Sequence, residues 1–165
     1  MEIKKEVIIN KSIKEAWHLL GEQFTEVDKW SRVINHSAAQ NGKSLNGSSC
    51  TERGCDISGM GEVKEKLLVF SPDAYQLSYQ IFEGLPSMVK YAENNWTLLS
   101  QGNNKTKLSM RLKADTQGLM GAIMKPMMKM NFSKMGDGLI EDFKFYLENG
   151  KPSPAKLKAI KKSKK

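Results

Sequence analysis

Short segments in which apolar and polar residues alternate make up much of the chain before residue 115. The alternation is clearest at 106–114, where Leu108, Met110, Leu112 and Ala114 fall on one strand face and basic or hydroxyl side chains fall on the other. One buried face and one solvated face are typical of an antiparallel sheet. Alternation and turn residues together predict strands over 3–9, 33–39, 48–56, 62–70, 75–83, 88–99 and 106–114, and the pattern is weakest at 33–39.

Two short helices are expected after the first strand. Ser12 and Glu15 have the spacing of a capping box, in which the Ser12 hydroxyl accepts from the Glu15 amide and the Glu15 side chain accepts from the Ser12 amide. The apolar spacing that follows predicts a helix over 13–20, which Gly21 ends. A second and shorter helix is expected over 26–31.

A methionine-rich segment at 118–150 predicts one long amphipathic helix, and it holds six of the ten methionines of the chain. Its apolar positions recur with helical spacing and form one stripe of Met124, Met128, Phe132, Met135, Leu139 and Phe143. Methionine side chains are flexible and polarizable, so this stripe suggests the wall of an adaptable pocket, although such a stripe is also common in an ordinary core.

Three small or rigid residues interrupt the pattern of the long helix. Pro126 either starts the helix or kinks it. Gly136 and Gly138 each cost about 1 kcal/mol relative to alanine inside a helix. We expect them to leave a gap between the helix and the sheet, and the alternative is that they let the helix bend. Methionines outside the stripe, Met120, Met127 and Met130, are candidates for a flexible entrance to a cavity.

The charge of the chain is concentrated at its C-terminal end. The net charge is +8, with 26 basic and 18 acidic residues among 165. Residues 151–165 hold seven lysines and no acid, so 19 basic and 18 acidic residues remain in 1–150, a balance of +1. A nucleic-acid-binding domain carries a basic surface on the fold itself, and none is predicted here. We therefore expect one domain over 1–150 and a Lys-rich, disordered tail over 151–165, with weak contact of the tail with RNA or anionic lipid as the alternative.

Neither a metal site nor a local disulfide is expected. Cys50 and Cys55 are the only cysteines and the chain has two histidines, too few for a structural zinc site. In a strand, residues five apart point to opposite faces, so the two thiols are expected to be reduced. No cofactor is predicted. The N-terminal residues lack the apolar run of a signal peptide, and no segment has the length of a membrane span, so a cytoplasmic protein is expected.

The order strand, two helices, strand meander and long final helix resembles the SRPBCC superfamily, as do several stretches: 13–17 with Trp30, 61–67, 78–81, 95–96 with 106–110, and 119–128. The last of these is similar to the bacterial polyketide cyclase/dehydrase-like branch, and the superfamily also includes START-related lipid carriers and birch-allergen-like proteins. The resemblance covers about 2–149. It implies an α+β helix-grip fold, with a curved antiparallel sheet of six to seven strands around the C-terminal helix and an apolar cavity between them.

The strongest candidate for a polar group in such a cavity is Glu65. It shares a strand face with Val63, Leu67 and Val69, and an inward carboxylate among apolar side chains needs a partner. If the preceding hairpin turns near 57–60, Arg53 lies opposite Glu65 on the same face. We predict an Arg53–Glu65 pair at the cavity wall, which orients a polar head group or takes part in acid–base chemistry. The alternative is an ordinary cross-strand surface pair.

Aromatic residues supply the remaining candidates. Tyr79 lies on an apolar strand face, whereas Tyr91 and Trp96 lie on opposite faces of one strand, so only one of these two points inward. His36 is a weak catalytic candidate, because no nucleophile–base arrangement accompanies it. The expected ligand-binding set is Arg53, Glu65, Tyr79, Trp96, Met124, Met128, Phe132, Met135 and Leu139.

These features favour a non-catalytic protein, a monomer or homodimer, that binds a hydrophobic small molecule such as a lipid, a polyketide or an aromatic metabolite. The alternative is an enzyme of the cyclase, aromatase or dehydratase type that uses acid–base residues of the cavity. An entirely apolar and aromatic lining favours binding, whereas several polar groups within hydrogen-bond reach of one another favour chemistry. A third hypothesis is an interaction module that acts through the basic tail.

Overall fold

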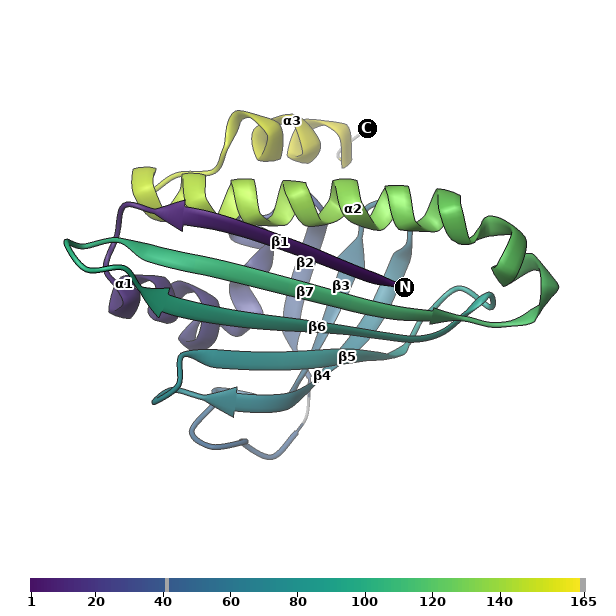
Figure 1. Ribbon diagram of the computed structural model, residues 1–165, viewed down its shortest axis with the longest axis horizontal. Coiled ribbons are helices and arrows are strands. Elements are labelled where there is room, and N and C mark those ends of the chain that lie inside the picture. The colour runs from purple at the N-terminus through teal and green to yellow at the C-terminus, as the bar shows by residue number, and fades with distance from the viewer. Residues whose placement is uncertain (41, 164–165) are drawn as a thin grey trace.

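The computed structural model describes residues 1–40 and 42–163, in which a curved antiparallel sheet packs against one long helix (Figure 1). The strands are β1 (Glu2–Ile9), β2 (Ile34–Ala39), β3 (Glu52–Ile57), β4 (Gly61–Ser71), β5 (Gln76–Glu83), β6 (Val89–Ser100) and β7 (Thr106–Thr116). The helices are α1 (Ile13–Trp17), a π-helical turn η1 (His18–Glu22), a 3₁₀ helix η2 (Phe24–Lys29), α2 (Gly118–Asn149) and α3 (Pro154–Ser163).

The seven strands follow the order β1-β7-β6-β5-β4-β3-β2, and all neighbours are antiparallel. The meander from β2 to β7 therefore runs in sequence order, and β1 joins it beside β7. One face of this sheet and the inner face of α2 bury their apolar side chains on each other, as the two-layer rule requires. The predicted helix-grip fold is confirmed.

All seven predicted strands are present, and two details differ. β3 begins at Glu52 rather than at Ser48, because Ser48 belongs to a turn in which its hydroxyl accepts from the Leu45 amide at 3.0 Å. The register of β4 against β5 shifts between Leu67 and Val69. This bulge turns Val69 outward, although the alternation had placed it on the inner face.

The first helix carries the predicted capping box. The Glu15 amide donates to Ser12 Oγ at 3.3 Å, and the Ser12 amide donates to a Glu15 carboxylate oxygen at 3.0 Å. Gly21 does not end this helix, because the helical path continues through η1 to Glu22. A Cβ atom on Gly21 would lie 2.6 Å from the Trp17 ring, so the glycine serves close packing rather than termination. The next helix covers Phe24–Lys29 instead of 26–31.

Helix α2 begins eight residues before Pro126, so the proline lies inside it, and Figure 1 shows the helix bending near its N-terminal end. Of the predicted inward stripe, Met128, Phe132, Leu139 and Phe143 are buried, and Met124 and Met135 are partly buried.

The two glycines of α2 do not leave a gap beside the sheet. A Cβ atom on Gly136 would lie 2.8 Å from Met110 Cε and 3.3 Å from a Lys5 side-chain carbon. A Cβ atom on Gly138 would lie 3.4 Å from the Arg32 side chain. Both glycines are buried. They therefore allow the helix to approach its neighbours closely.

The Lys-rich end of the chain differs from the expectation of a disordered tail, because Pro154–Ser163 forms α3 above α2 (Figure 1). Ser153 Oγ accepts from the Lys156 amide at 3.0 Å and so caps the helix. Lys156 is only 2% exposed, and its Nζ donates to the Ile34 carbonyl oxygen at 2.7 Å. Counting lysines misses these long-range contacts. Among the described residues, no helix is both long and apolar enough to cross a membrane.

Candidate functional site

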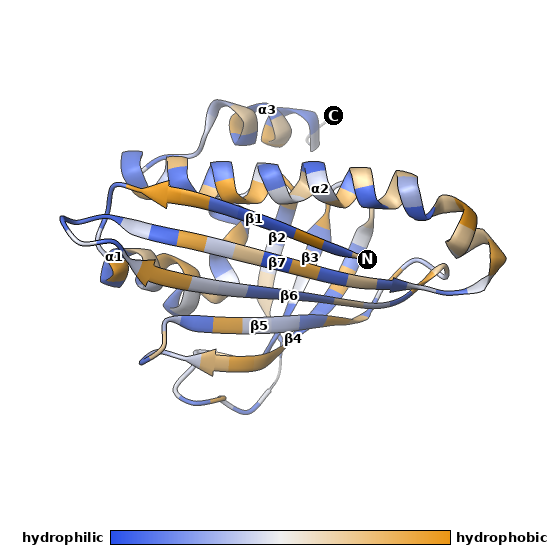
Figure 2. Cartoon of the chain, viewed as in Figure 1, coloured by the Kyte–Doolittle hydropathy of each residue, from blue (hydrophilic) through white to orange (hydrophobic). Residues whose placement is uncertain are grey.

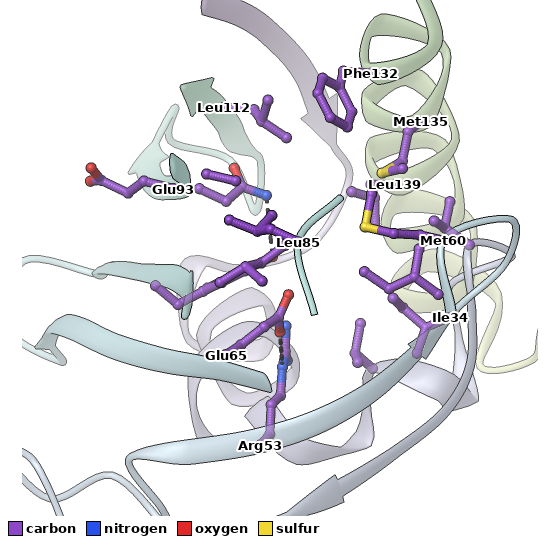
Figure 3. A pocket seen from close by; sticks show the side chains of 17 residues that line it. Ile34, Arg53, Met60, Glu65, Leu85, Glu93, Leu112, Phe132, Met135 and Leu139 are labelled. Carbon is purple, nitrogen blue, oxygen red and sulfur yellow. Dashed lines mark hydrogen bonds and ion pairs between the residues drawn. The ribbon is translucent and has the colours of Figure 1, made fainter. Parts of the chain in front are cut away.

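A cavity of about 60 Å³ lies between the inner face of the sheet and α2 (Figure 3). Strands β2 to β7, helix η2 and helix α2 all contribute side chains to it. Its wall is mainly apolar, with polar groups at one end: Val27, Val33, Ile34, Arg53, Ile57, Met60, Glu65, Tyr79, Ile81, Leu85, Ala92, Glu93, Asn94, Leu112, Phe132, Met135 and Leu139. Since a single water needs about 10–15 Å³ by the same measure, the space holds a few waters in this conformation.

The polar end of the cavity is built around Arg53 and Glu65. They are direct partners in the β3–β4 register, as the position of the hairpin turn predicts. Arg53 Nε donates to Glu65 Oε2 at 2.6 Å, and the two residues are 4% and 3% exposed. An exposed cross-strand pair, the alternative from the sequence, is therefore ruled out. The second carboxylate oxygen, Glu65 Oε1, has no hydrogen-bond partner within 1–40 and 42–163, and Figure 3 shows the carboxylate facing the cavity.

Two aromatic rings and one carbonyl hold the Arg53 guanidinium in place. Its central carbon lies 3.8 Å from the Phe24 ring centroid and 4.9 Å from that of Tyr79. Its Nη1 donates to the Phe24 carbonyl oxygen. Burial alone lowers the pKa of Arg53, but the attraction of Glu65 and the neighbouring acidic groups outweighs burial and raises it overall. The guanidinium is therefore a fixed cation that forms cation–π contacts with two neighbouring rings.

Two weak acids beside this pair stay protonated at neutral pH. Cys55 Sγ lies 3.6 Å from Glu65 Oε2 and donates to it. Burial, with a further contribution from Glu65, raises the pKa of Cys55 to about 11. Burial and the same carboxylate raise the pKa of Tyr79 to about 12. Neither group is ionised at neutral pH, so neither is an activated nucleophile or base there.

Asn94 extends the polar end onto β6. Its Nδ2 donates to the Tyr79 hydroxyl oxygen at 3.2 Å. Its Oδ1 is buried and has no hydrogen-bond partner in the described part of the chain. A buried acceptor without a partner is costly, which makes this atom a second position for a ligand or water donor.

An open groove of about 620 Å³ adjoins the cavity, and four side chains line both spaces: Val33, Met60, Phe132 and Met135. Met60 lies in the β3–β4 turn, and Phe132 and Met135 lie on α2. Two of the four are unbranched methionines, which change rotamer readily. We define Met60, Phe132 and Met135 as the gate, because their side chains separate the inner cavity from the groove.

Comparisons with known proteins rest on structure, because the sequence matches no family model and no curated protein. A START superfamily protein from Mycobacterium smegmatis is 11% identical, with a TM-score of 0.56 over 83% of this chain and 96% of that one. Norcoclaurine synthase from Thalictrum flavum is 15% identical, with a TM-score of 0.64 over 84% and 91%. The di-domain ARO/CYC protein BexL, from the BE-7585A biosynthetic pathway, is 10% identical, with a TM-score of 0.67 over 88% and 47%.

The chain shares the helix-grip fold of these proteins. At these identities the likeness establishes the fold, and the chemistry of the site has to be argued from the site itself.

Within this helix-grip fold, six of the nine expected site residues line the cavity: Arg53, Glu65, Tyr79, Phe132, Met135 and Leu139. Trp96 faces inward and Tyr91 does not, but Trp96 lies behind Tyr79 and lines a small neighbouring pocket. Met128 lines the groove. Met124 packs against a second apolar cluster and lines neither space.

His36 lies away from the cavity. Its side chain is 75% exposed, and its Nδ1 is 3.6 Å from an Asp28 carboxylate oxygen. The structure does not bring it near Glu65, so the weak catalytic candidate from the sequence is not part of this site. No group of three or more His, Cys, Asp or Glu side chains in 1–40 and 42–163 is placed to hold a metal ion.

Sequence reasoning missed Asn94 and Met60 as cavity groups, and Cys55 as a hydrogen-bond partner of Glu65. Asn94 is two residues before the buried Trp96, so its inward direction could have been inferred from strand period alone. Cys55 shares the β3 face of Arg53 for the same reason. Met60 sits in a turn, where no periodic signal exists.

Cys55 offers a direct test of burial at the polar end. In the native protein it is expected to react with iodoacetamide at least ten times more slowly than in the unfolded protein at about pH 8, because it is buried and protonated.

The pKa of Cys55 is raised from 9.0 to about 11, so its stabilising effect is complete below pH 9 and is lost as the pH rises towards 11. Between pH 9 and pH 11 the unfolding free energy of Cys55→Ala should therefore fall less steeply with pH than that of the wild type. Equal slopes for the two proteins would contradict a raised pKa for Cys55.

Proposed function

We propose that the protein binds a hydrophobic small molecule that carries a hydroxyl or amino group. The supporting observation is the cavity itself, which joins an apolar wall to a buried Arg53–Glu65 pair whose Glu65 Oε1 has no partner among the described residues. Apolar burial supplies most of the binding energy, at about 25 cal/mol per Å². The free carboxylate oxygen and Asn94 Oδ1 both accept, so the ligand group that meets them donates.

The ligand enters through the gate. The inner cavity is smaller than the roughly 300–1,000 Å³ typical of ligand pockets. The groove on the other side of Met60, Phe132 and Met135 has a volume of about 620 Å³. Movement of these three side chains joins the two spaces, with the apolar body of the ligand in the groove and its donor group at Glu65.

The first experiment is native mass spectrometry of the full chain purified from its source cells. A co-purified hydrophobic molecule, bound with a stoichiometry of one and released by organic solvent, supports the proposal. A chain that carries no added mass after gentle purification, and that takes up none on incubation with a lipid extract of the same cells, opposes it.

Glu65→Gln is expected to reduce the occupancy by the co-purified molecule about tenfold or more, because a charge-assisted hydrogen bond contributes about 1.5–3 kcal/mol. The glutamine keeps the size of the side chain and an oxygen for Arg53. Glu83→Gln is the matched control, because Glu83 pairs with Lys64 at an exposed position of the neighbouring strand. Unchanged occupancy in Glu65→Gln would remove Glu65 from the proposed site.

The second candidate function is a cyclase, aromatase or dehydratase type of enzyme, and one observation favours it. Polar groups do converge at one end of the cavity, since Arg53, Glu65, Tyr79 and Asn94 line it and form one network with Cys55, which donates to Glu65. Glu65 would be the base, because Cys55 and Tyr79 stay protonated. Conversion of the co-purified molecule, or of its precursors, by the wild type and not by Glu65→Gln would establish this function. Binding without turnover leaves the first proposal.

A further inference from the structure

Large apolar side chains are exposed along the first part of α2. The side chains of Leu119, Met120, Ile123, Met127 and Met130, which we call the exposed stripe, are 46–78% exposed. With about 100° of rotation per residue, they fall within an arc of roughly 100° on one side of the helix. The buried residues of α2, such as Met128 and Leu139, lie on the opposite side. The stripe is therefore a second apolar face that the sheet does not cover.

Figure 2 shows this apolar colouring at the N-terminal end of α2, where the helix bends at one extremity of the molecule. Contiguous exposed apolar surface usually marks an interaction site. The methionines of the exposed stripe, Met120, Met127 and Met130, do not line the groove. On α2 the groove is lined by Met128 and Met135 instead. A role in lining the groove therefore does not explain why these methionines are exposed.

The charge around the exposed stripe indicates what covers it. Residues 117–136 contain Lys125, Lys129 and Lys134 and no acidic residue. All three lysines are exposed, and none forms an ion pair with another described residue. Apolar side chains beside unpaired lysines suit the interface of an anionic lipid bilayer, where the apolar groups enter the acyl boundary and the lysines meet phosphates.

A second copy of the chain fits the exposed stripe less well. In a two-fold symmetric contact the same patch meets itself. Lys134 lies on the same arc as the stripe, one turn further along, and Lys129 lies about 80° outside that arc, whereas Lys125 lies on the opposite side of the helix. A dimer through this arc would bury the two Lys134 side chains in an apolar contact, which is unfavourable.

We propose that the exposed stripe of α2 docks the protein peripherally on anionic membranes, with the helix lying in the bilayer interface. Met128, Asn131 and Lys134 line the groove and adjoin the stripe in the same helix, so docking brings the groove close to the lipid surface. The inference stands on the exposed stripe and its lysines, and it holds whether or not the cavity binds a ligand.

The test is co-sedimentation of the full chain with phosphatidylcholine vesicles, with and without phosphatidylserine. Wild type is expected to bind only the vesicles that contain phosphatidylserine, and to bind less as NaCl rises from about 0.1 M to about 1 M. The triple variant Leu119→Gln, Met120→Gln and Ile123→Gln keeps the charge and should bind at least tenfold more weakly. The double variant Lys129→Gln and Lys134→Gln should lose about fivefold per lysine, the equivalent of about 1 kcal/mol each.

The control removes equal charge from α3 with Lys158→Gln and Lys161→Gln, which should change vesicle binding less than the α2 double variant does. Circular dichroism confirms that each variant is folded, as expected for exposed positions. The proposal is overturned if wild type binds neither kind of vesicle, binds both equally, or loses binding through the α3 variant alone. It is also overturned if the triple variant binds vesicles normally but abolishes a dimer of the wild type.

Discussion

Replacing Arg53 with methionine is expected to lower the free energy of unfolding by about 3–5 kcal/mol, because it leaves the Glu65 carboxylate buried without its cation. Glu65 is 3% exposed, and Cys55 Sγ would be its remaining donor. The Phe24 carbonyl oxygen would lose its donor too. Urea denaturation followed by tryptophan fluorescence measures the change, since the three tryptophans are buried.

A double variant separates the ion pair from simple loss of packing. Arg53→Met combined with Glu65→Leu replaces both charges by apolar groups of similar size, which often restores stability in buried pairs. We expect the double variant to be more stable than Arg53→Met alone. Lys64→Met is the control, because its pair with Glu83 is about half exposed on both sides and contributes less than about 1 kcal/mol. A loss below about 1 kcal/mol in Arg53→Met would show that the guanidinium is not required to neutralise a buried charge.

The double variant also bears on function. If a uniquely folded protein remains without Arg53 and Glu65, the pair is not needed for the fold, which favours a role in ligand binding. A buried pair is weak evidence for stability in its own right. The same variant should then lose the co-purified molecule, whereas the apolar part of the cavity remains.

The strand pattern and the Arg53–Glu65 register could be predicted from the sequence because both depend on local rules. Alternation has a period of two, and the turn at 57–60 fixes which residues face each other across the hairpin. The inward direction of Glu65 follows from its apolar neighbours on the same face. Its burial confirms that prediction.

Other features depend on contacts that no local rule contains. The path of the chain at Gly21 is set by the ring of Trp17, and the gate combines a turn methionine with residues of α2 far along the chain. Helix α3 is held by Lys156, which reaches the Ile34 carbonyl across 122 positions. Charge counting therefore indicated disorder where a tertiary contact gives a helix.

Replacing Asp142 with alanine is expected to lower the free energy of unfolding by about 3 kcal/mol, because this one buried carboxylate accepts several charge-assisted hydrogen bonds. Asp142 lies on α2 and is fully buried. It accepts from the Arg32 amide at 2.7 Å, from Arg32 Nε and Nη2 at 2.8 Å each, and from Ser153 Oγ. It therefore ties the segment before β2 and the start of α3 to α2. In this variant Arg32, which is 31% exposed, keeps its ion pair with Glu141. The loss of unfolding free energy should therefore be smaller than in Arg53→Met.

Two control variants separate the contribution of the buried Asp142 carboxylate from those of an exposed ion pair on α2 and of the α3 cap. Asp137→Ala removes an acid from the same helix whose partner is Lys5 at 2.6 Å, but its side chain is 48% exposed, so a loss below about 1 kcal/mol is expected. Ser153→Ala removes the α3 cap and the hydrogen bond that Ser153 Oγ donates to Asp142, at a cost of about 1 kcal/mol, and should speed tryptic cleavage after the lysines of α3 as much as Asp142→Ala does. If the unfolding free energy of Asp142→Ala lies within about 1 kcal/mol of the wild-type value, the Asp142 carboxylate does not hold these elements together. If cleavage in α3 stays slow in both variants, Lys156 alone anchors the helix against β2.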